Sequence, residues 1–372
     1  MNLIRIPKPC SAGIFLTYKC TSTCRHCMYA CSPRWPADWL SEEDGELVLT
    51  QLSRAMRDNW SYPGAVSLNE GLHFTGGEPF LNFELLLRLT EIAARQEMPS
   101  IFVETNGFWC REDGAARERL RLLKDAGLDG IMISANPFIL EQIPFECTER
   151  AARISQEVFG SNAMVYQEIF FRVFQALGTR AVLSFEEFLV EAGSGMQYAE
   201  ILPNGRVPYK LGMLMEPYPA SHFFGSSCQR ELLRDWHVHV DNYCNLVPGF
   251  CGGLSLGDAR ELDKLCRGID LDARPVLRAL LTDLADLLRL GKEHGYQERE
   301  SYVSKCHLCA DVRRHLVEHG DYLELKPAAF YARLEDGMED SHDDNARFRR
   351  LSLRRTGPLG PAAQRTGFQR GH

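Results

Sequence analysis

Between Ile14 and Gly205 the sequence repeatedly passes from a short apolar run to a turn rich in Gly, Asn or Pro, and then to a helical stretch. This alternation is typical of an α/β domain in which helices join parallel strands. The segment 146–192 is predicted to be mostly helical, so the sequence does not supply every strand of a complete barrel. We therefore expect a partial (β/α)6 TIM-like barrel, with strands at 13–17, 71–74, 100–104, 130–134 and 198–202.

Composition excludes several classes of partner. The chain has 372 residues, enough for two domains, and its 50 acidic and 42 basic residues give a formal charge of -8. No global basic field attracts it to nucleic acid or to an anionic membrane. No signal peptide or membrane span is recognisable, which predicts a cytoplasmic protein. A small molecule or a protein is the expected partner.

Thirteen cysteines, an odd number that falls in clusters, indicate metal ligation rather than disulfides. Cys20, Cys24 and Cys27 lie close together in a loop after the first predicted strand. Three thiolates at this spacing ligate three corners of a four-iron cluster and leave one iron open to a substrate. A zinc site with Cys31 or His26 as fourth ligand, or buried structural thiols, are the alternatives.

A glycine-bearing loop follows the second predicted strand. Gly76 and Gly77 allow the backbone to turn sharply and approach a ligand, and Glu78, before Pro79, offers an acceptor to an ammonium group. Taken alone, such a string is an ordinary turn. Its position one strand after the cysteine loop makes it a candidate binding loop.

Together these motifs resemble the radical S-adenosylmethionine (radical SAM) family. In that family the cysteines are spaced with three and then two residues between them, and a Gly-Gly-Glu-Pro loop binds the methionyl amino group. The resemblance implies that a [4Fe-4S] cluster on Cys20, Cys24 and Cys27 reduces S-adenosylmethionine and releases a 5′-deoxyadenosyl radical. It also implies that His26 lies near the adenine, and that a flavodoxin- or ferredoxin-type protein donates the electron.

Polar residues follow the third and fourth predicted strands, and one arginine follows the last. In barrels of parallel strands such positions face the active site. The resemblance implies that they hold ribose, carboxylate or substrate, whereas helix caps, turns or, for the arginine, a surface salt bridge are the alternatives. These candidates are Glu104, Asn106, Ser134, Asn136 and Arg206.

A second cysteine-rich region lacks the strand-loop-helix rhythm and is predicted to be a separate, metal-organised module with a β-hairpin after Cys228. Its cysteines resemble those of SPASM or twitch domains, and the one-cluster twitch arrangement fits better. The resemblance implies a second, auxiliary [4Fe-4S] cluster, in which Cys244 is an alternative ligand to Cys251. The other alternative is a zinc site on Cys306 and Cys309, completed by Cys228 and Cys251 or by His307. The four predicted ligands are Cys228, Cys251, Cys306 and Cys309.

These features predict three regions: a radical SAM core at 14–215, an auxiliary-cluster domain at 216–325, and a disordered tail at 336–372, which is acidic and then Arg-rich. Relatives with an auxiliary cluster often oxidise their substrate. We therefore expect a radical SAM oxidoreductase that modifies a natural-product precursor, with a small alcohol or sugar favoured because only nineteen residues precede Cys20.

Three other functions are alternatives. A maturase of ribosomally made peptides would act on a residue of a precursor peptide. A redox-neutral epimerase would need a thiol to quench the radical, and Cys31, Cys110 and Cys147 are candidates. A non-catalytic metal-binding protein has no need of the Gly-Gly-Glu-Pro loop, which argues against it.

Overall fold

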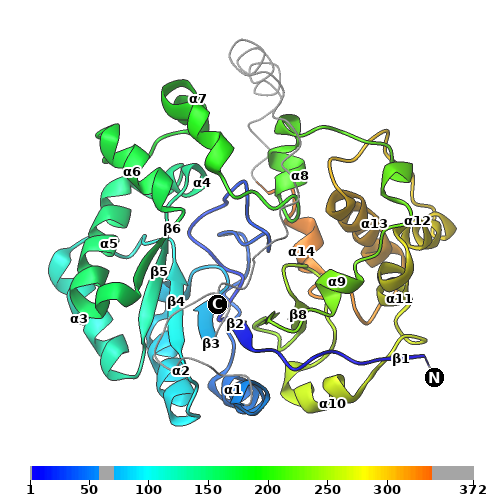
Figure 1. Cartoon of the computed structure of the whole chain (residues 1–372), viewed down its shortest axis with the longest axis horizontal. Helices are drawn as coiled ribbons and strands as arrows, with labels where there is room; N and C mark the ends of the chain where they lie inside the picture. Colours follow the sequence, from blue (N-terminus) through cyan, green and yellow to red (C-terminus); the bar gives the residue numbers. More distant parts are fainter. Residues whose placement is uncertain (1, 58–70, 337–372) are drawn as a thin grey trace, which may run out of the picture.

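The computed structural model describes residues 2–57 and 71–336, and Figure 1 shows their arrangement around one central sheet. Seven strands form this sheet in the order β6-β5-β4-β3-β2-β7-β8, in which β8 alone is antiparallel to its neighbour. The order does not close on itself, so the predicted partial TIM-like α/β barrel is confirmed. The strands of this sheet are β2 (Ser11–Phe15), β3 (Gly71–Thr75), β4 (Ile101–Thr105), β5 (Gly130–Ser134), β6 (Ala163–Tyr166), β7 (His237–Val240) and β8 (Leu246–Pro248).

Helices cover one face of the sheet, which is the outer face. Helix α2 packs on β4, and α5 packs on β5 and β6. In the neighbouring strands, side chains such as Ile14 of β2 and Phe74 of β3 are fully buried. Ser41 caps α1 by accepting a hydrogen bond from the backbone N–H of Asp44. The helices of this half, seen on the left of Figure 1, are α1 (Glu42–Met56), α2 (Phe83–Arg95), α3 (Asp113–Asp125), α4 (Pro137–Leu140), α5 (Phe145–Phe159), α6 (Glu168–Ala176) and α7 (Phe185–Ala192).

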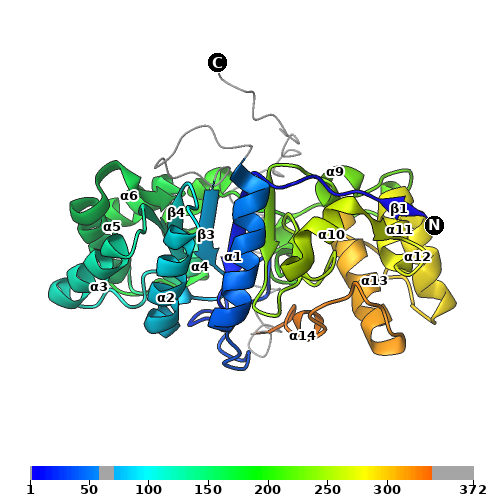
Figure 2. The same cartoon turned by 90° about the horizontal axis from the view of Figure 1, so that it is seen from below.

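The cysteine-rich half packs beside this sheet and contributes to it (Figures 1 and 2). Its helices α11, α12 and α13 pack on one another, and a small sheet pairs β1 (Leu3–Ile4) with β9 (Ile269–Asp270). No helix among the described residues is long and apolar enough to cross a membrane. The helices of this half are α8 (Val207–Lys210), α9 (Gln229–Leu232), α10 (Leu262–Arg267), α11 (Pro275–Thr282), α12 (Leu284–Glu293), α13 (Lys305–His319) and α14 (Ala329–Ala332).

Four of the five expected strands are present, with ends that differ by at most two residues from those expected. The strand expected at 198–202 is wrong, because a 3-10 helix occupies Gly193–Tyr198 and residues 199–202 form no strand. Apolar side chains there, such as Ile201, instead pack on a second hydrophobic cluster. Strand β6 was missed within the stretch expected to be helical, since its Ala and Met are good helix formers.

The cysteine-rich region is not separate from the core, contrary to the expectation. Strand β7 pairs in parallel with β2, so the predicted hairpin β7-β8 extends the core sheet. The tail expected from residue 336 lies outside the described residues except for Asp336, which is buried.

Candidate functional site

The first three cysteines lie in the cysteine loop, residues 16–35, which begins where β2 ends. Cys20 and Cys24 are buried and Cys27 is half-buried. The thiols act on one another, because Cys20 and Cys27 both raise the pKa of Cys24 beyond the effect of burial. The structure therefore brings the three predicted ligands together.

Two N–H groups point at sulfur atoms in this loop. The side-chain amide of Asn106 donates to Cys20 Sγ at 3.7 Å, and the backbone N–H of Cys31 donates to Cys27 Sγ at 3.4 Å. A hydrogen bond with the Cys31 thiol also lowers the pKa of Cys27 to about 6. Such bonds stabilise anionic sulfur, and they tune the potential of iron-sulfur clusters. The donor set thus suits an iron-sulfur cluster.

Arg206 holds the cysteine loop from inside the protein. Its side chain is fully buried, and its guanidinium donates to the carbonyl oxygens of Ala30 and Cys31, each at 2.8 Å, and of Arg333 at 3.1 Å. Its backbone N–H donates to the carbonyl oxygen of Cys27 at 3.1 Å. The surface salt bridge considered from the sequence is therefore wrong. The guanidinium uses its donors on the loop that carries the cysteines.

The glycine loop, residues 75–79, packs directly on the start of the cysteine loop. The N–H of Gly77 donates to the carbonyl oxygen of Thr17 at 2.7 Å, and a Cβ atom at Gly77 would lie 1.9 Å from the carbonyl oxygen of Lys19. Gly76 has a φ of 115°, which favours glycine. Pro79 then begins a 3-10 helix, Pro79–Asn82. Both glycines are needed because two backbones meet here.

Glu78 is buried beneath this loop, with 1 % of its surface exposed. One carboxylate oxygen accepts from the Thr105 hydroxyl at 2.9 Å and from the Phe80 N–H at 3.2 Å, while the other accepts from the Asn106 N–H at 2.9 Å. Burial raises its pKa to about 7. The carboxylate therefore joins the glycine loop to the end of β4, in addition to any acceptor role toward an ammonium group.

His26 and Asn136 are brought together at the end of β5. The His26 ring stacks on Phe138, with centroids 4.8 Å apart, and its Nε2 lies 3.3 Å from the Asn136 amide nitrogen. Burial and the nearby Arg206 lower the pKa of His26 to about 4. Ser134 is half-buried as the last residue of β5.

Glu104 lies further inside. One oxygen of its carboxylate accepts from the Thr75 hydroxyl at 2.7 Å, and the other lies 3.5 Å from His73 Nε2. The residue is the fourth of β4, and it faces the side of the sheet opposite the helices. It therefore connects the glycine loop to the inner face.

The structure also brings together the other four predicted cysteines, the auxiliary set. Burial raises the pKa of Cys228, and the thiols of Cys309, Cys251 and Cys306 raise it further. Cys306 and Cys309 lie near the start of α13, where Ser304 accepts a hydrogen bond from the N–H of His307. Exposed N–H groups at a helix start stabilise negative charge, such as that of thiolates.

Cys244 lies elsewhere. It has a φ of 61° in the turn between β7 and β8, and the charged groups that act on its thiol are Asp44, Arg260 and Asp258, with Asp241. None of the auxiliary set is among them. The geometry therefore groups Cys251, and not Cys244, with the other three cysteines.

The two cysteine sets are linked by neighbouring backbone. A Cβ atom at Gly252, next to Cys251, would lie 2.9 Å from the carbonyl oxygen of Met28, next to Cys27. Burial raises the pKa of the Tyr29 hydroxyl, and Cys251 and Cys27, one from each set, raise it further. The two sites therefore share one interior region.

The sequence analysis missed three histidines on the inner face, His73, His237 and His239. Burial lowers the pKa of His73 and of His239 to about 3, and lowers that of His237 as well. The alternation His-Val-His in β7 was a usable signal, because residues two apart share one face of a strand.

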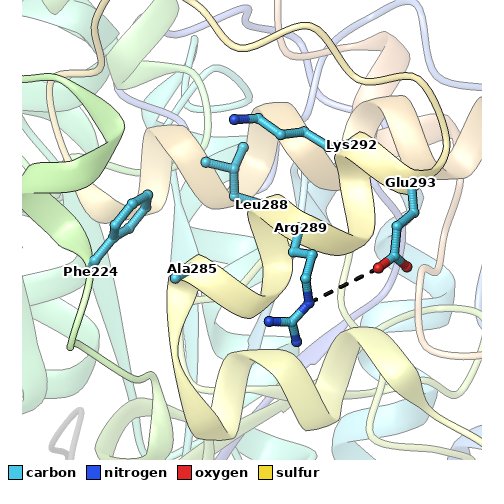
Figure 3. Close-up of a pocket in the computed structure, with 6 residues that line it drawn as sticks. All are labelled: Phe224, Ala285, Leu288, Arg289, Lys292 and Glu293. Atoms are coloured by element: carbon cyan, nitrogen blue, oxygen red, sulfur yellow. Dashed lines mark ion pairs between the residues drawn. The ribbon is translucent and has the colours of Figure 1, made fainter.

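A separate groove, shown in Figure 3, contains none of the predicted site residues. It is lined by Phe224, Ala285, Leu288, Arg289, Lys292 and Glu293.

Comparison with known proteins agrees with the geometry of the first site. Residues 14–138, which include the cysteine loop and the glycine loop, match the Radical SAM superfamily. The chain carries a radical SAM domain. GTP 3′,8-cyclase of Mycolicibacterium smegmatis is 34% identical over 123 residues, which are 32% of this chain and 29% of that enzyme. The match thus spans less than a third of the relative.

The solved structures that resemble the chain are more distant in sequence. The chain covers 98% of anSMEcpe with bound AdoMet, at 12% identity over 92% of its own length and a TM-score of 0.42. It covers 87% of BtrN in complex with AdoMet and 2-DOIA, at 15% identity over 73% of its own length and a TM-score of 0.38.

Proposed function

We propose that this protein is a radical SAM enzyme that oxidises a small-molecule precursor, with an alcohol or sugar favoured. Cys20, Cys24 and Cys27 would hold the catalytic [4Fe-4S] cluster. When bound, this cluster supplies one electron that cleaves S-adenosylmethionine to methionine and a 5′-deoxyadenosyl radical, which takes a hydrogen atom from the substrate. The electron would come from a flavodoxin- or ferredoxin-type protein in the cytoplasm.

The residues around the first site support this assignment. Asn106 and Cys31 direct N–H groups at two of the sulfurs. The glycine loop contacts the residues just before Cys20, so a ligand held by its backbone would lie beside the open iron. His26, stacked on Phe138, offers a flat surface for the adenine.

The observation that carries the oxidative assignment is the close approach of the backbone next to Cys251 to the backbone next to Cys27. Gly252 abuts Met28, and Tyr29 lies within the influence of Cys27 and Cys251. We propose that the auxiliary set holds a second [4Fe-4S] cluster. It would take one electron from the substrate radical, which also loses a proton to solvent, so that the product is oxidised by two electrons.

Arg313 supports a negatively charged group at the auxiliary set. Its buried guanidinium donates to the Gly252 carbonyl oxygen at 3.2 Å. Burial raises the pKa of the Cys251 thiol to about 11, and the Arg313 charge acts in the opposite direction, in favour of the thiolate. A cluster with four thiolate ligands carries net negative charge, so a buried cation beside it is favourable.

A small substrate is favoured over a peptide by the similarity to GTP 3′,8-cyclase, which is named for its action on GTP. The inner face around Glu104 and Ser134 provides polar groups for hydroxyls. Tyr166 of the neighbouring β6 bonds Glu200 and adds another polar group.

The first experiment measures S-adenosylmethionine cleavage. Protein reconstituted without oxygen and reduced with dithionite should produce 5′-deoxyadenosine, and the variant with Cys20, Cys24 and Cys27 replaced by Ala should produce none. A Cys244→Ser variant, which changes a buried thiol outside both sets, is the matched control and should retain cleavage. Unchanged cleavage in the triple variant would refute the assignment.

The second experiment counts iron and follows product. The wild type should bind about eight irons per chain, and the Cys306→Ala, Cys309→Ala variant about four. This variant should still cleave S-adenosylmethionine but form no oxidised product. Full turnover in a stably folded variant would exclude the electron-acceptor role, and stoichiometric zinc in the auxiliary set would exclude the cluster.

A further inference from the structure

Three histidines converge on the inner face of the sheet. His73 lies on β3, and His237 and His239 lie on β7, with only 1 %, 2 % and 4 % of their surfaces exposed. Their ligand nitrogens all lie within 4.8 Å of one another, and within residues 2–57 and 71–336 no other group of His, Cys, Asp or Glu converges in this way. Neither cysteine set contributes to it.

Gly13 makes this convergence possible. It lies on β2 between the two strands, paired with His73 on one side and with His239 on the other. A Cβ atom at Gly13 would lie 2.4 Å from His73 Nε2 and 2.4 Å from the His239 ring. The space that a side chain would fill is occupied by the edges of these rings.

The hydrogen bonds of His237 fix its protonation. The Ser11 hydroxyl donates to the carbonyl oxygen of Trp236 at 2.7 Å, and it lies 2.6 Å from His237 Nδ1. Because its one proton goes to the carbonyl, the hydroxyl accepts from His237, so Nδ1 carries the hydrogen. The Nε2 atom of His237 therefore presents a lone pair.

The same reasoning applies to His239. Its Nδ1 lies 2.9 Å from the carbonyl oxygen of Gly249, which only accepts, and 3.0 Å from the Tyr29 hydroxyl, which donates to the same carbonyl oxygen at 3.2 Å. Because the one proton of the hydroxyl goes to the carbonyl, both oxygens accept from Nδ1, which carries the hydrogen. Its Nε2 then also presents a lone pair, and it lies 3.3 Å from the Nε2 of His237. Two lone pairs cannot hydrogen-bond each other at this distance. A cation bound between the two Nε2 atoms would remove the repulsion between their lone pairs.

His73 completes the group. Its Nε2 is buried and has no hydrogen-bond partner, an arrangement that costs about 1–3 kcal/mol. The nearest charged group is the Glu104 carboxylate, 3.5 Å away. Three ring nitrogens thus face one another, and the carboxylate lies beside one of them.

We propose that His73, His237 and His239 bind a divalent transition metal ion through Nε2. Two nitrogens bound to one tetrahedral zinc ion at about 2.0–2.1 Å are about 3.3 Å apart, which matches the separation of the His237 and His239 nitrogens. Imidazole ligands suit zinc or ferrous iron. The carbonyl and hydroxyl that orient the two Nδ1 atoms are the usual partners of metal-bound histidines.

This site goes beyond the proposed radical chemistry and does not depend on it. Glu104 also accepts from Thr75, the first residue of the glycine loop. A bound ion would connect strands β3 and β7, and Glu104 beside His73 would link the site to the loop that we assign to S-adenosylmethionine.

The test uses full-length protein whose thiols are first filled by iron-sulfur reconstitution and which is then passed over a chelating resin. Zn²⁺ is added, and metal content and zinc X-ray absorption are measured. The site predicts one zinc per chain, with only nitrogen and oxygen ligands at about 2.0–2.1 Å. His239→Asn should abolish this zinc, whereas His222→Asn, which changes an exposed histidine outside the group, should retain it.

A milder variant tests the site without removing a ligand. Ser11→Ala deletes the hydroxyl that orients His237 and should weaken zinc binding about 10–100-fold in a chelator competition. Iron content and circular dichroism establish that each variant is folded. Absence of zinc binding in the wild type, a shell with sulfur at about 2.3 Å, or equal affinity in Ser11→Ala would overturn the proposal.

Discussion

Replacing Arg206 by Lys separates two roles for this side chain. The resemblance to radical SAM enzymes implies a contact with a carboxylate or with substrate, whereas the structure uses the guanidinium to hold the cysteine loop. Lysine keeps the charge but has one nitrogen in place of a planar fork. It therefore cannot reach the carbonyl oxygens of Ala30, Cys31 and Arg333 at once.

The magnitude follows from the bonds that are lost. Loss of two of the three short hydrogen bonds to a charged donor, at about 1.5–3 kcal/mol each, lowers the free energy of unfolding by about 3–6 kcal/mol. At roughly 2–4 °C per kcal/mol, Tm should fall by at least about 6 °C. Because the guanidinium also donates to the carbonyl oxygens of Cys24 and Cys31, at 3.5 Å and 2.8 Å, the variant should lose iron faster than the wild type.

The assay is thermal unfolding together with iron retention under a chelator. Arg34→Lys is the matched control, because Arg34 belongs to the same loop but half of its side chain is exposed. This control should change stability by less than about 0.5 kcal/mol. An Arg206→Lys variant with wild-type Tm and iron retention but weaker S-adenosylmethionine binding would refute the structural role.

Three further predictions follow from individual contacts. Gly77→Ala should abolish S-adenosylmethionine binding, measured by equilibrium dialysis, because its Cβ would meet a backbone oxygen at 1.9 Å; Gly114→Ala, where nothing lies within 4 Å, should not. Burial raises the pKa of Asp241 from 3.8 to about 6, so its contribution to stability is present below pH 4 and is lost as pH rises through 6. Asp241→Asn should remove this pH dependence of the free energy of unfolding, roughly 3 kcal/mol in total, when urea unfolding is measured at several pH values. An unchanged pH dependence would contradict the assignment. Arg313→Gln should lower the midpoint potential of the proposed second cluster by tens of millivolts in an EPR-monitored titration, and an unshifted potential would contradict the proposed position of that cluster beside Arg313.

Local motifs were predictable from the sequence because each depends on a few adjacent residues. The cysteine spacing and the two glycines each belong to a single loop, and most strands of the core are predicted correctly from short apolar runs. Strand β6 was not predictable in this way, because its four residues follow helix α5 without an apolar alternation. Its pairing with β5 decides its conformation.

Long-range contacts could not be predicted from one sequence. Arg206 lies 175 positions from Cys31, whose carbonyl oxygen it binds, and no local pattern encodes that pair. His73 and His239 are likewise distant in the chain, and they meet only because β7 pairs with β2. A hairpin that was expected to belong to a separate module gave no reason to place it beside β2.

Strand β2 explains why the cysteine loop, the glycine loop and the three inner histidines lie close together. It precedes the cysteine loop, pairs with β3 in front of the glycine loop, and pairs with β7 on its other side. Since side chains alternate between the faces of a strand, a slip of one residue between β2 and β7 would turn His237 and His239 toward the outer face. The backbone register of five residues, Ser11–Phe15, therefore fixes both the approach of the glycine loop to Cys20 and the convergence of the histidines. Gly13, in the middle of this strand, is the residue on which the second of these depends.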